Sequence, residues 1–446
     1  MAKWTAWVVV CSCFLGVIIH QVNAQNGLNQ PPVDLSQPLT LQECVQVARE
    51  NATDMRNARI NLAIQDLRVK NARARYFPEI FLSGRYGFSD AIDFGFEQEN
   101  YDLGLSGRYT LWDNGQREAS FSQAKESRKA TESRNLLIQQ NLVFQVTQSY
   151  YNVLQAQELI NVNEEVLARS RENTERVRAF LEVGSAIEAD VATAQVREAT
   201  DALALLNVQN NLVLELAGLP RIMGLDPGTV ISLAQDTTYQ LYVQKGEIEV
   251  FPLSIEEVIQ LALENRPEVP EIQARIKQLE WDLTLAKLDR LPRLDAQYDY
   301  NVNLDDYLRE RENFKDFRSW DVTATLNFTI FDGGVTQRRV TEAELALEQA
   351  REDATDLERG IALEVRQAYL TLKTDERRLE ISNTQVRDAE LSLEVTRGRY
   401  EVEEATLLDF LQVQTEYARV LTDQVRAFYD YKISQAALQR AMGVIQ

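Results

Sequence analysis

Apolar and polar side chains alternate strictly in four stretches of about ten residues each. In the clearest one, the apolar positions are Leu294, Ala296, Tyr298, Tyr300 and Val302. Alternation of this kind gives a β-strand one apolar face and one polar face. The pattern therefore predicts four strands, at residues 79–89, 101–112, 293–303 and 320–331.

The apolar faces of these strands can be covered either by a second sheet or by lipid, because a soluble sandwich also alternates. We favour a membrane β-barrel, since the strands have about the length that crosses hydrocarbon when tilted and aromatic residues cluster towards their ends. We interpret these aromatics as interfacial anchors rather than as a ligand-binding cluster: Tyr109, Trp112, Tyr300, Trp320 and Phe331. Charged residues of the opposite face either line the barrel lumen or simply keep that face wet: Arg85, Arg108, Asp295, Asp299 and Asp321.

A barrel in lipid cannot leave sheet edges open, so it has to close. The smallest outer-membrane barrels have about eight strands, and this chain offers four. Two or more copies of the chain must therefore share one barrel, with membrane lipid around it.

Long helical patterns flank the strands, at about residues 40–77, 116–180 and 187–217 in the first half of the chain. The longest would extend near 95 Å at about 1.5 Å per residue. Its apolar seam repeats every seven residues, as does the seam of its counterpart, which predicts left-handed supercoiling against neighbouring helices. The shorter helices together match the long one, so they could stack end to end beside it. A periplasmic coiled-coil rod or adaptor without a pore is the alternative, but it leaves the strands unexplained.

The chain is an internal duplication. Residues 39–224 and 253–446 carry the same order of helices, strands and turns at constant offsets, with a linker at 225–252 that we expect to be irregular. The predicted fold is thus mainly α with a transmembrane β-barrel contribution, built from a repeated helix-strand-strand-helix-helix unit whose hairpin tips lie at about 181–187 and 400–406.

The N-terminus reads as a secretory signal. Lys3 precedes a short apolar run, and small residues follow near position 24, so residues 1–24 are expected to be removed. The run is too short to span a membrane, and no lipid anchor is predicted. Residues 25–38 are expected to form a mobile tail.

Composition argues against catalysis and nucleic-acid binding. Loss of Lys3 changes the net charge from −21 to −22, and the only histidine leaves with the signal. Cys44 is then the sole cysteine, so no Cys/His metal site or intrachain disulfide can form. We find no catalytic motif and expect no cofactor, and so acidic a chain is a poor candidate for nucleic-acid binding.

These features together resemble the outer-membrane efflux protein family, the TolC-type channel-tunnels. The resemblance rests on the duplicated unit, on the turns Leu111–Gly115 and Ile330–Gly334, and on two hairpin tips that are each followed by an Asp and, five residues on, a Gln. It implies a trimer with a twelve-stranded barrel in the outer membrane and a helical tunnel across the periplasm. It also implies a periplasmic adaptor, an inner-membrane pump and a passive role as exit duct in efflux or type I secretion.

The same resemblance points to a gate at the tips, where carboxylates of several copies ring the closed entrance. Asp409 matches the first such position, Gln412 stands where a second carboxylate often occurs, and the first repeat offers Asp190 with Glu188 nearby. Rings of this kind attract cations. Both aspartates could equally well just favour the positive N-terminal end of a helix.

The tips themselves are candidate adaptor contacts and differ from each other. Gly184 supplies a flexible glycine in the first tip, whereas the second tip is acidic: Glu401, Glu403 and Glu404. This departure from the family pattern suggests a basic partner surface.

Overall fold

The computed structural model describes residues 37–91, 96–234, 238–245, 251–303, 318–402 and 404–445. The predicted signal peptide, nearly all of the predicted tail and Glu403 lie outside these ranges.

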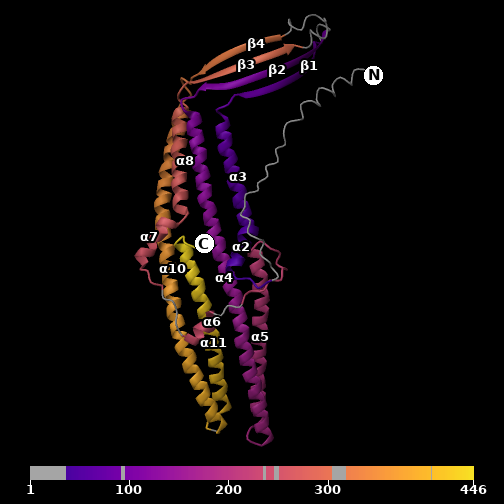
Figure 1. Cartoon of the computed structure of the whole chain (residues 1–446), viewed down its shortest axis with the longest axis vertical. Helices are drawn as coiled ribbons and strands as arrows, with labels where there is room; N and C mark the ends of the chain where they lie inside the picture. Colours follow the sequence, from indigo (N-terminus) through magenta and orange to yellow (C-terminus); the bar gives the residue numbers. More distant parts are fainter. Residues whose placement is uncertain are drawn as a thin grey trace, which may run out of the picture. The chain divides into compact units, whose positions relative to one another are not determined.

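The two halves of the chain fold into the same series of elements (Figure 1). The first half contains α2 (Leu41–Asn51), α3 (Thr53–Ala74), β1 (Glu79–Ala91), β2 (Phe96–Trp112), α4 (Gln116–Glu182) and α5 (Glu188–Ile222). After α6 (Thr238–Lys245), the second half contains α7 (Ile255–Asn265), α8 (Glu268–Leu288), β3 (Arg293–Asn303), β4 (Arg318–Asn327), α10 (Val335–Glu401) and α11 (Leu407–Ala441). The long helices α4 and α10 both have 67 residues, and α5 and α11 both have 35.

The strands form one antiparallel sheet in the order β1-β2-β3-β4. Register keeps apolar residues level across it, as in the row Leu82, Leu105, Tyr300 and Trp320. All four predicted strands are present, but β4 ends at Asn327 rather than at residue 331. Its partner β3 begins at Arg293, opposite Asn327, so no described residue of β3 lies opposite residues 328–331.

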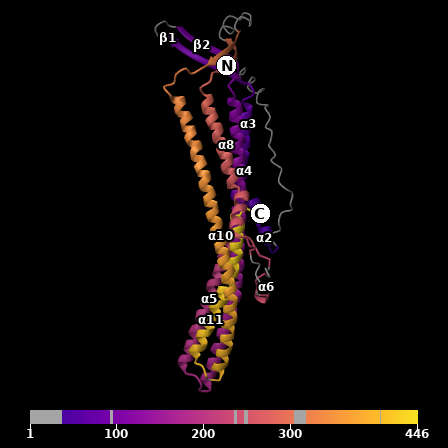
Figure 2. The same cartoon turned by 90° about the vertical axis from the view of Figure 1, so that its left-hand side faces the viewer.

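The long helices pack side by side in two arrangements (Figures 1 and 2). Beside the strands, α3 contacts α4, α4 contacts α8, and α8 contacts α10; towards the tips, α5 contacts α4, α4 contacts α11, and α11 contacts α10. The predicted seven-residue seams form the contacts, because most of their members are buried, and these five completely: Val146, Val153, Val365, Leu372 and Leu379.

The shorter helices stack end to end, as expected. The turn after α5 places Gly224 against the junction of α2 and α3, where an added Cβ would lie 2.3 Å from the Asn51 carbonyl oxygen. Gly443 meets the junction of α7 and α8 in the same way, 2.9 Å from the Arg266 nitrogen. Both glycines have positive φ, 77° and 73°, which other residues rarely adopt.

The structure differs from the prediction at two helix boundaries and in the linker. The first helix is broken at Ala52, whose backbone is extended (ψ 135°) and whose N–H caps α2 by donating to the Ala48 carbonyl. Helix α5 continues through Pro220 to Ile222. The linker is not wholly irregular, since it contains α6, which is fixed by two buried side chains, Tyr239 and Tyr242.

Candidate functional site

One face of the sheet is apolar and uncovered. Within the part of the chain that the structure describes, Ile80, Leu82 and Trp320 are 71%, 66% and 69% exposed. An apolar face this large is costly in water. Its exposure in a single chain therefore indicates an apolar medium around the sheet.

The opposite face is polar and internally hydrogen-bonded. Ser106 Oγ donates to Asp299 Oδ1 (2.6 Å), and Thr110 Oγ1 donates to Asp295 Oδ1 (2.8 Å). Asp321 lies opposite Asp299 in the register. All five residues expected to line a lumen share this face: Arg85, Arg108, Asp295, Asp299 and Asp321.

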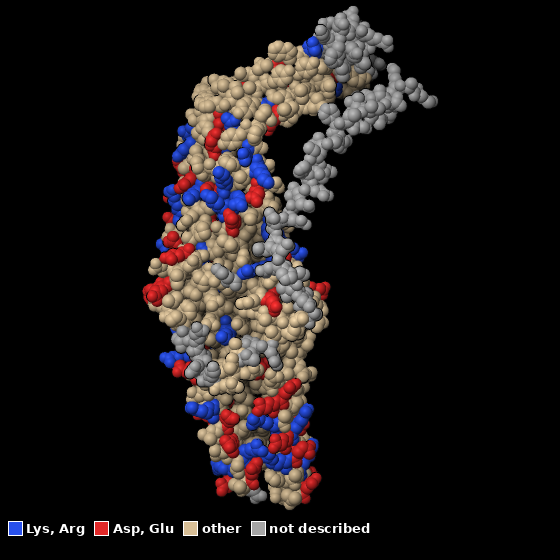
Figure 3. Space-filling model, viewed as in Figure 1, with Lys and Arg blue, Asp and Glu red and all other residues tan. Residues whose placement is uncertain are grey.

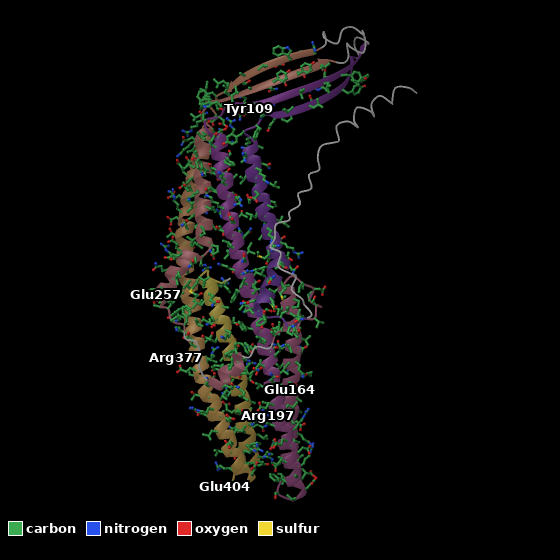
Figure 4. The ribbon with its side chains drawn as sticks, in the orientation of Figure 1. Tyr109, Glu164, Arg197, Glu257, Arg377 and Glu404 are labelled. Carbon is green, nitrogen blue, oxygen red and sulfur yellow. The ribbon has the colours of Figure 1, made fainter. Side chains whose placement is uncertain are left out.

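The predicted aromatic anchors lie at two levels. Tyr300 and Trp320 are directly paired near the far end of the sheet, while Trp112 pairs with Leu294 at the helix end. Six residues of strand separate these levels, about 20 Å at roughly 3.3 Å per residue. Tyr109 lies near the strand–helix junction (Figure 4), and Phe331 lies just beyond β4 and is 87% exposed. Two belts this far apart suit the boundaries of an apolar band.

The strand-exit turns are held by an aspartate. Asp113 accepts from the Gly115 N–H (3.3 Å) and pairs with Arg117 (2.8 Å). In the second repeat, Asp332 accepts from the Gly334 N–H (2.9 Å). These contacts start α4 and α10 directly from the sheet.

An aromatic core joins the two hairpins at their tips. Tyr400 of α10 stacks on Phe410 of α11 (5.5 Å between ring centroids, 7° between planes) and lies 6.1 Å from Phe180 of α4. Val177 and Ala194 of the first hairpin belong to the same buried cluster. Both tips therefore lie together at the opposite end of the long helices from the sheet.

The gate candidate Asp409 caps α11. Its Oδ2 accepts from the Thr406 hydroxyl (2.6 Å) and from the Thr406 N–H (3.1 Å), and its own N–H donates to Thr406 Oγ1 (3.2 Å). These hydrogen bonds lower the pKa of the exposed Asp409 carboxyl and so favour its ionised form. Capping is thus a real role of Asp409, and it is compatible with a gate.

The other gate candidates are also near helix starts. Asp190 accepts from the Ile187 N–H (3.1 Å), but Ile187 offers no hydroxyl in return, so this cap is only half formed. Glu188 is exposed beside it. Gln412 and Asp409 line a groove of about 830 Å³ between α10 and α11.

Comparison with known proteins identifies the family of this chain. The sequence pattern of the outer membrane efflux protein family matches residues 44–225 and again 258–444. The chain belongs to the outer membrane efflux protein family. Its resemblance to TolC-type channels is confirmed, and with it the outer-membrane location.

Individual relatives support this family assignment. The chain is 24% identical to the protein CyaE of Bordetella pertussis over 87% of this chain and 80% of that protein. It is also 24% identical to the outer membrane protein TolC of Vibrio cholerae, over 84% of each. The outer membrane channel CmeC of Campylobacter jejuni has the same fold, with a TM-score of 0.78 and 18% identity over 90% of this chain and 85% of that one.

In this efflux-family chain, the acidic second tip is partly neutralised. Glu401 pairs with Arg176 of α4 (3.1 Å) and with Arg397 (3.2 Å), and both arginines also reach Glu172 (2.7 and 3.2 Å). We had not predicted this four-residue ionic cluster, although the i,i+4 pairs Glu172/Arg176 and Arg397/Glu401 were visible in the sequence.

Glu404 and Gly184 are the other tip candidates that the structure describes. Glu404 lies at the end of the second hairpin (Figure 4), with its backbone carbonyl bound by Arg399 (3.3 Å). Gly184 has φ 82° and nothing close to where its side chain would be.

A polar layer lies above the aromatic core. The Ser170 hydroxyl donates to the buried Asp201 carboxylate, which also pairs with Arg197 (2.9 Å). Arg197 reaches from α5 to the Thr415 hydroxyl of α11 (2.6 Å; Figure 4). Gln414, the glutamine that repeats after each tip in the family-like pattern, is buried in this layer. Among the described residues, no His, Cys, Asp and Glu cluster suited to a metal ion is present.

Proposed function

We propose that this chain forms the passive exit duct of a tripartite efflux or type I secretion system. The observation that carries the proposal is a sheet with a lipid-suited face and a polar face, continued by helical hairpins about 100 Å long at roughly 1.5 Å per residue. Such an assembly supplies a wall and a path, and transport through it requires no bond chemistry.

The sheet is incomplete in one chain, because β1 and β4 are both edges. Duplication suggests how it closes. The internal joint pairs the second strand of one repeat with the first strand of the next, β2 with β3. The equivalent joint between copies pairs β4 with β1, and three copies would give twelve strands.

Three copies would also gather the gate residues. Asp409 and Asp190, with Glu188 and Gln412 beside them, would form an acidic constriction at the tips that favours cations. The tip residues Gly184, Glu401, Glu403 and Glu404 would meet a periplasmic adaptor that couples the duct to an inner-membrane pump.

Planar-bilayer conductance of the detergent-purified protein tests this proposal. Asp409→Asn keeps an acceptor for the Thr406 N–H but removes the charge, whereas Thr406→Ala keeps the charge and removes half of the cap. We expect a small cation-selective conductance that rises or loses selectivity in Asp409→Asn and changes less in Thr406→Ala.

Two results would contradict the proposal. If Thr406→Ala opens the pore as much as Asp409→Asn, Asp409 acts through capping alone and the acidic gate is wrong. If the protein stays soluble without detergent and never inserts, the duct itself is wrong, and a periplasmic coiled-coil protein without a pore is favoured.

A further inference from the structure

Helix α3 has an apolar face that no element of the described part of the chain covers. It packs on α4 through Met55 and Ala58, which are buried. Ile60, Ile64 and Leu67 on the other side are 56%, 42% and 56% exposed. Their spacing of four and three residues is that of a coiled-coil seam, which packs against a second helix.

Basic side chains flank this seam. They occupy the positions on either side of the apolar residues and are all exposed: Arg56, Arg68, Lys70 and Arg75. Flanking positions of this kind choose a coiled-coil partner by charge. Because the net charge of the chain is −21, an exposed basic face is unusual on it and favours an acidic partner surface.

Helix α10 carries the complementary face. Its inner side meets α8 through the buried Val340 and Leu347, and Lys287 of α8 approaches Glu344 (3.7 Å). From residue 342 to residue 356, the side away from α8 is exposed and, apart from Leu345, acidic: Glu342, Glu352, Asp353 and Asp356. Figure 3 shows charged side chains gathered on the helices that adjoin the sheet.

The internal duplication identifies how these two faces meet. Within the chain, α4 of the first repeat contacts α8 of the second, and Gln123 of α4 donates to the Asp282 carboxylate of α8. The repeat counterpart of α4 is α10, and that of α8 is α3. The contact equivalent to Gln123–Asp282 therefore joins Glu342 to Arg68, which lie in different copies.

We infer that α10 of each copy docks on α3 of the next copy through this charge-matched seam, with Glu342 facing Arg68. The inference rests on the proposed shared barrel and adds the residues that assemble it. The internal joint places its carboxylate on α8, whereas the joint between copies places its carboxylate on α10. This reversal discriminates against docking α8 where α3 belongs, since the carboxylates of Glu342 and Asp282 would then meet.

Charge reversal tests the pairing. Arg68→Glu and Glu342→Arg should each lower the temperature at which the purified oligomer dissociates, and the double variant should restore most of the loss. Arg73→Glu is the matched control. The repeat counterpart of Arg73 is Lys287, which approaches α10 of its own repeat. Arg73 should therefore face α4 of its own chain and not the next copy. If the double variant is no better than the worse single variant, the pairing is wrong.

Disulfide cross-linking provides a test that does not depend on stability or transport. In a Cys44→Ala background, Arg68→Cys combined with Glu342→Cys should form covalent oligomers on oxidation that stop at the closed ring. Either cysteine alone should give none, since the contact joins different faces. Cross-linking by one cysteine alone, or no cross-linking by the pair, would overturn the inference.

The two proposals can fail separately. Cross-linked rings that do not conduct would retain the interface and refute the duct, whereas a conducting protein that does not cross-link would do the opposite.

Discussion

At the scale of single residues, the two repeats begin the helix after the hairpin tip with different side chains. Thr406 and Asp409 exchange hydrogen bonds at the start of α11, whereas Ile187 can only donate its N–H to Asp190 at the start of α5. A full capping interaction contributes about 1 kcal/mol. The start of α11, beside the proposed gate, is therefore held more firmly than the start of α5. Because Asp409 carries both the charge and the cap, variants have to be chosen that remove one without the other.

Glycine at the stacked helix junctions gives a residue-scale prediction. Gly224→Ala should destabilise the protein by about 1–2 kcal/mol for a left-handed backbone and by about 1–3 kcal/mol more for crowding, because its Cβ would meet Asn51 and Ala52. Gly184→Ala is the control, with a similar φ of 82° and open space. Thermal unfolding of the two variants measures the difference. Equal losses would show that the stacked junction does not constrain Gly224.

At the scale of elements, the heptad seams and strict alternation were sufficient to locate the long helices and the strands. Residues such as Val146 and Leu372 belong to seams that repeat every seven residues, a spacing typical of packed helices. Both residues are fully buried. The break at Ala52 was missed because the sequence around it stays helical in character. Its repeat counterpart, Arg266, precedes Pro267 and carried the missing signal, since proline disfavours a helical residue before it.

Helix α6 could not be predicted, because its stability comes from tertiary contacts. Eight residues are too few for a helix in isolation. Tyr242 provides the tertiary contacts that hold the helix. Its side chain is 4% exposed, its hydroxyl donates to the Leu379 carbonyl (3.0 Å), and its ring lies 5.2 Å from that of Phe428. Tyr239 packs on the same ring (5.3 Å).

Docking of α6 should therefore depend on Tyr242. Tyr242→Phe should cost about 1 kcal/mol for one hydrogen bond, and Tyr242→Ala about 3–5 kcal/mol for the ring, which is enough to undock the helix. Hydrogen exchange of the α6 amides measures both effects. Unchanged protection in Tyr242→Ala would show that other contacts hold α6.

The same tyrosine predicts an alkaline limit. Burial raises the pKa of Tyr242 to about 12 from its ordinary 10.0. Because the docked state disfavours the ionised form, its contribution to stability is complete below pH 10 and is lost as the pH rises through 12. Tyr242→Phe should reduce this loss, as followed by thermal unfolding across that range. An identical pH profile in both proteins would exclude Tyr242 as its source.

At the scale of the whole molecule, the sequence indicated that several chains assemble but not which faces meet. All the seams look alike in sequence, since an apolar residue every three or four positions suits an intrachain and an interchain contact equally. The structure separates them by exposure. Helix α5 is long and apolar enough to cross a membrane by length and composition, yet only 6% of that stretch is buried. Its exposed residues nevertheless follow a heptad, including Val196, Leu203, Leu206 and Val213, which suits another helix better than lipid.

This free seam of α5 should hold the tip halves of neighbouring copies together. By the duplication argument, α4 contacts α11 within the chain, so α10 should contact α5 of the next copy. Leu206→Glu would forfeit about 1.5–3 kcal/mol of apolar burial at each joint and place a charge there. We expect oligomers to be lost in size-exclusion chromatography with light scattering while circular dichroism stays helical. Gln209 is a polar neighbour that lines, with Leu206, a groove between α4 and α5 of the same chain, so Gln209→Glu should leave assembly intact. If Leu206→Glu still forms the full oligomer, the α5 seam faces solvent or the adaptor, and the copies are held by the sheet and α3 alone.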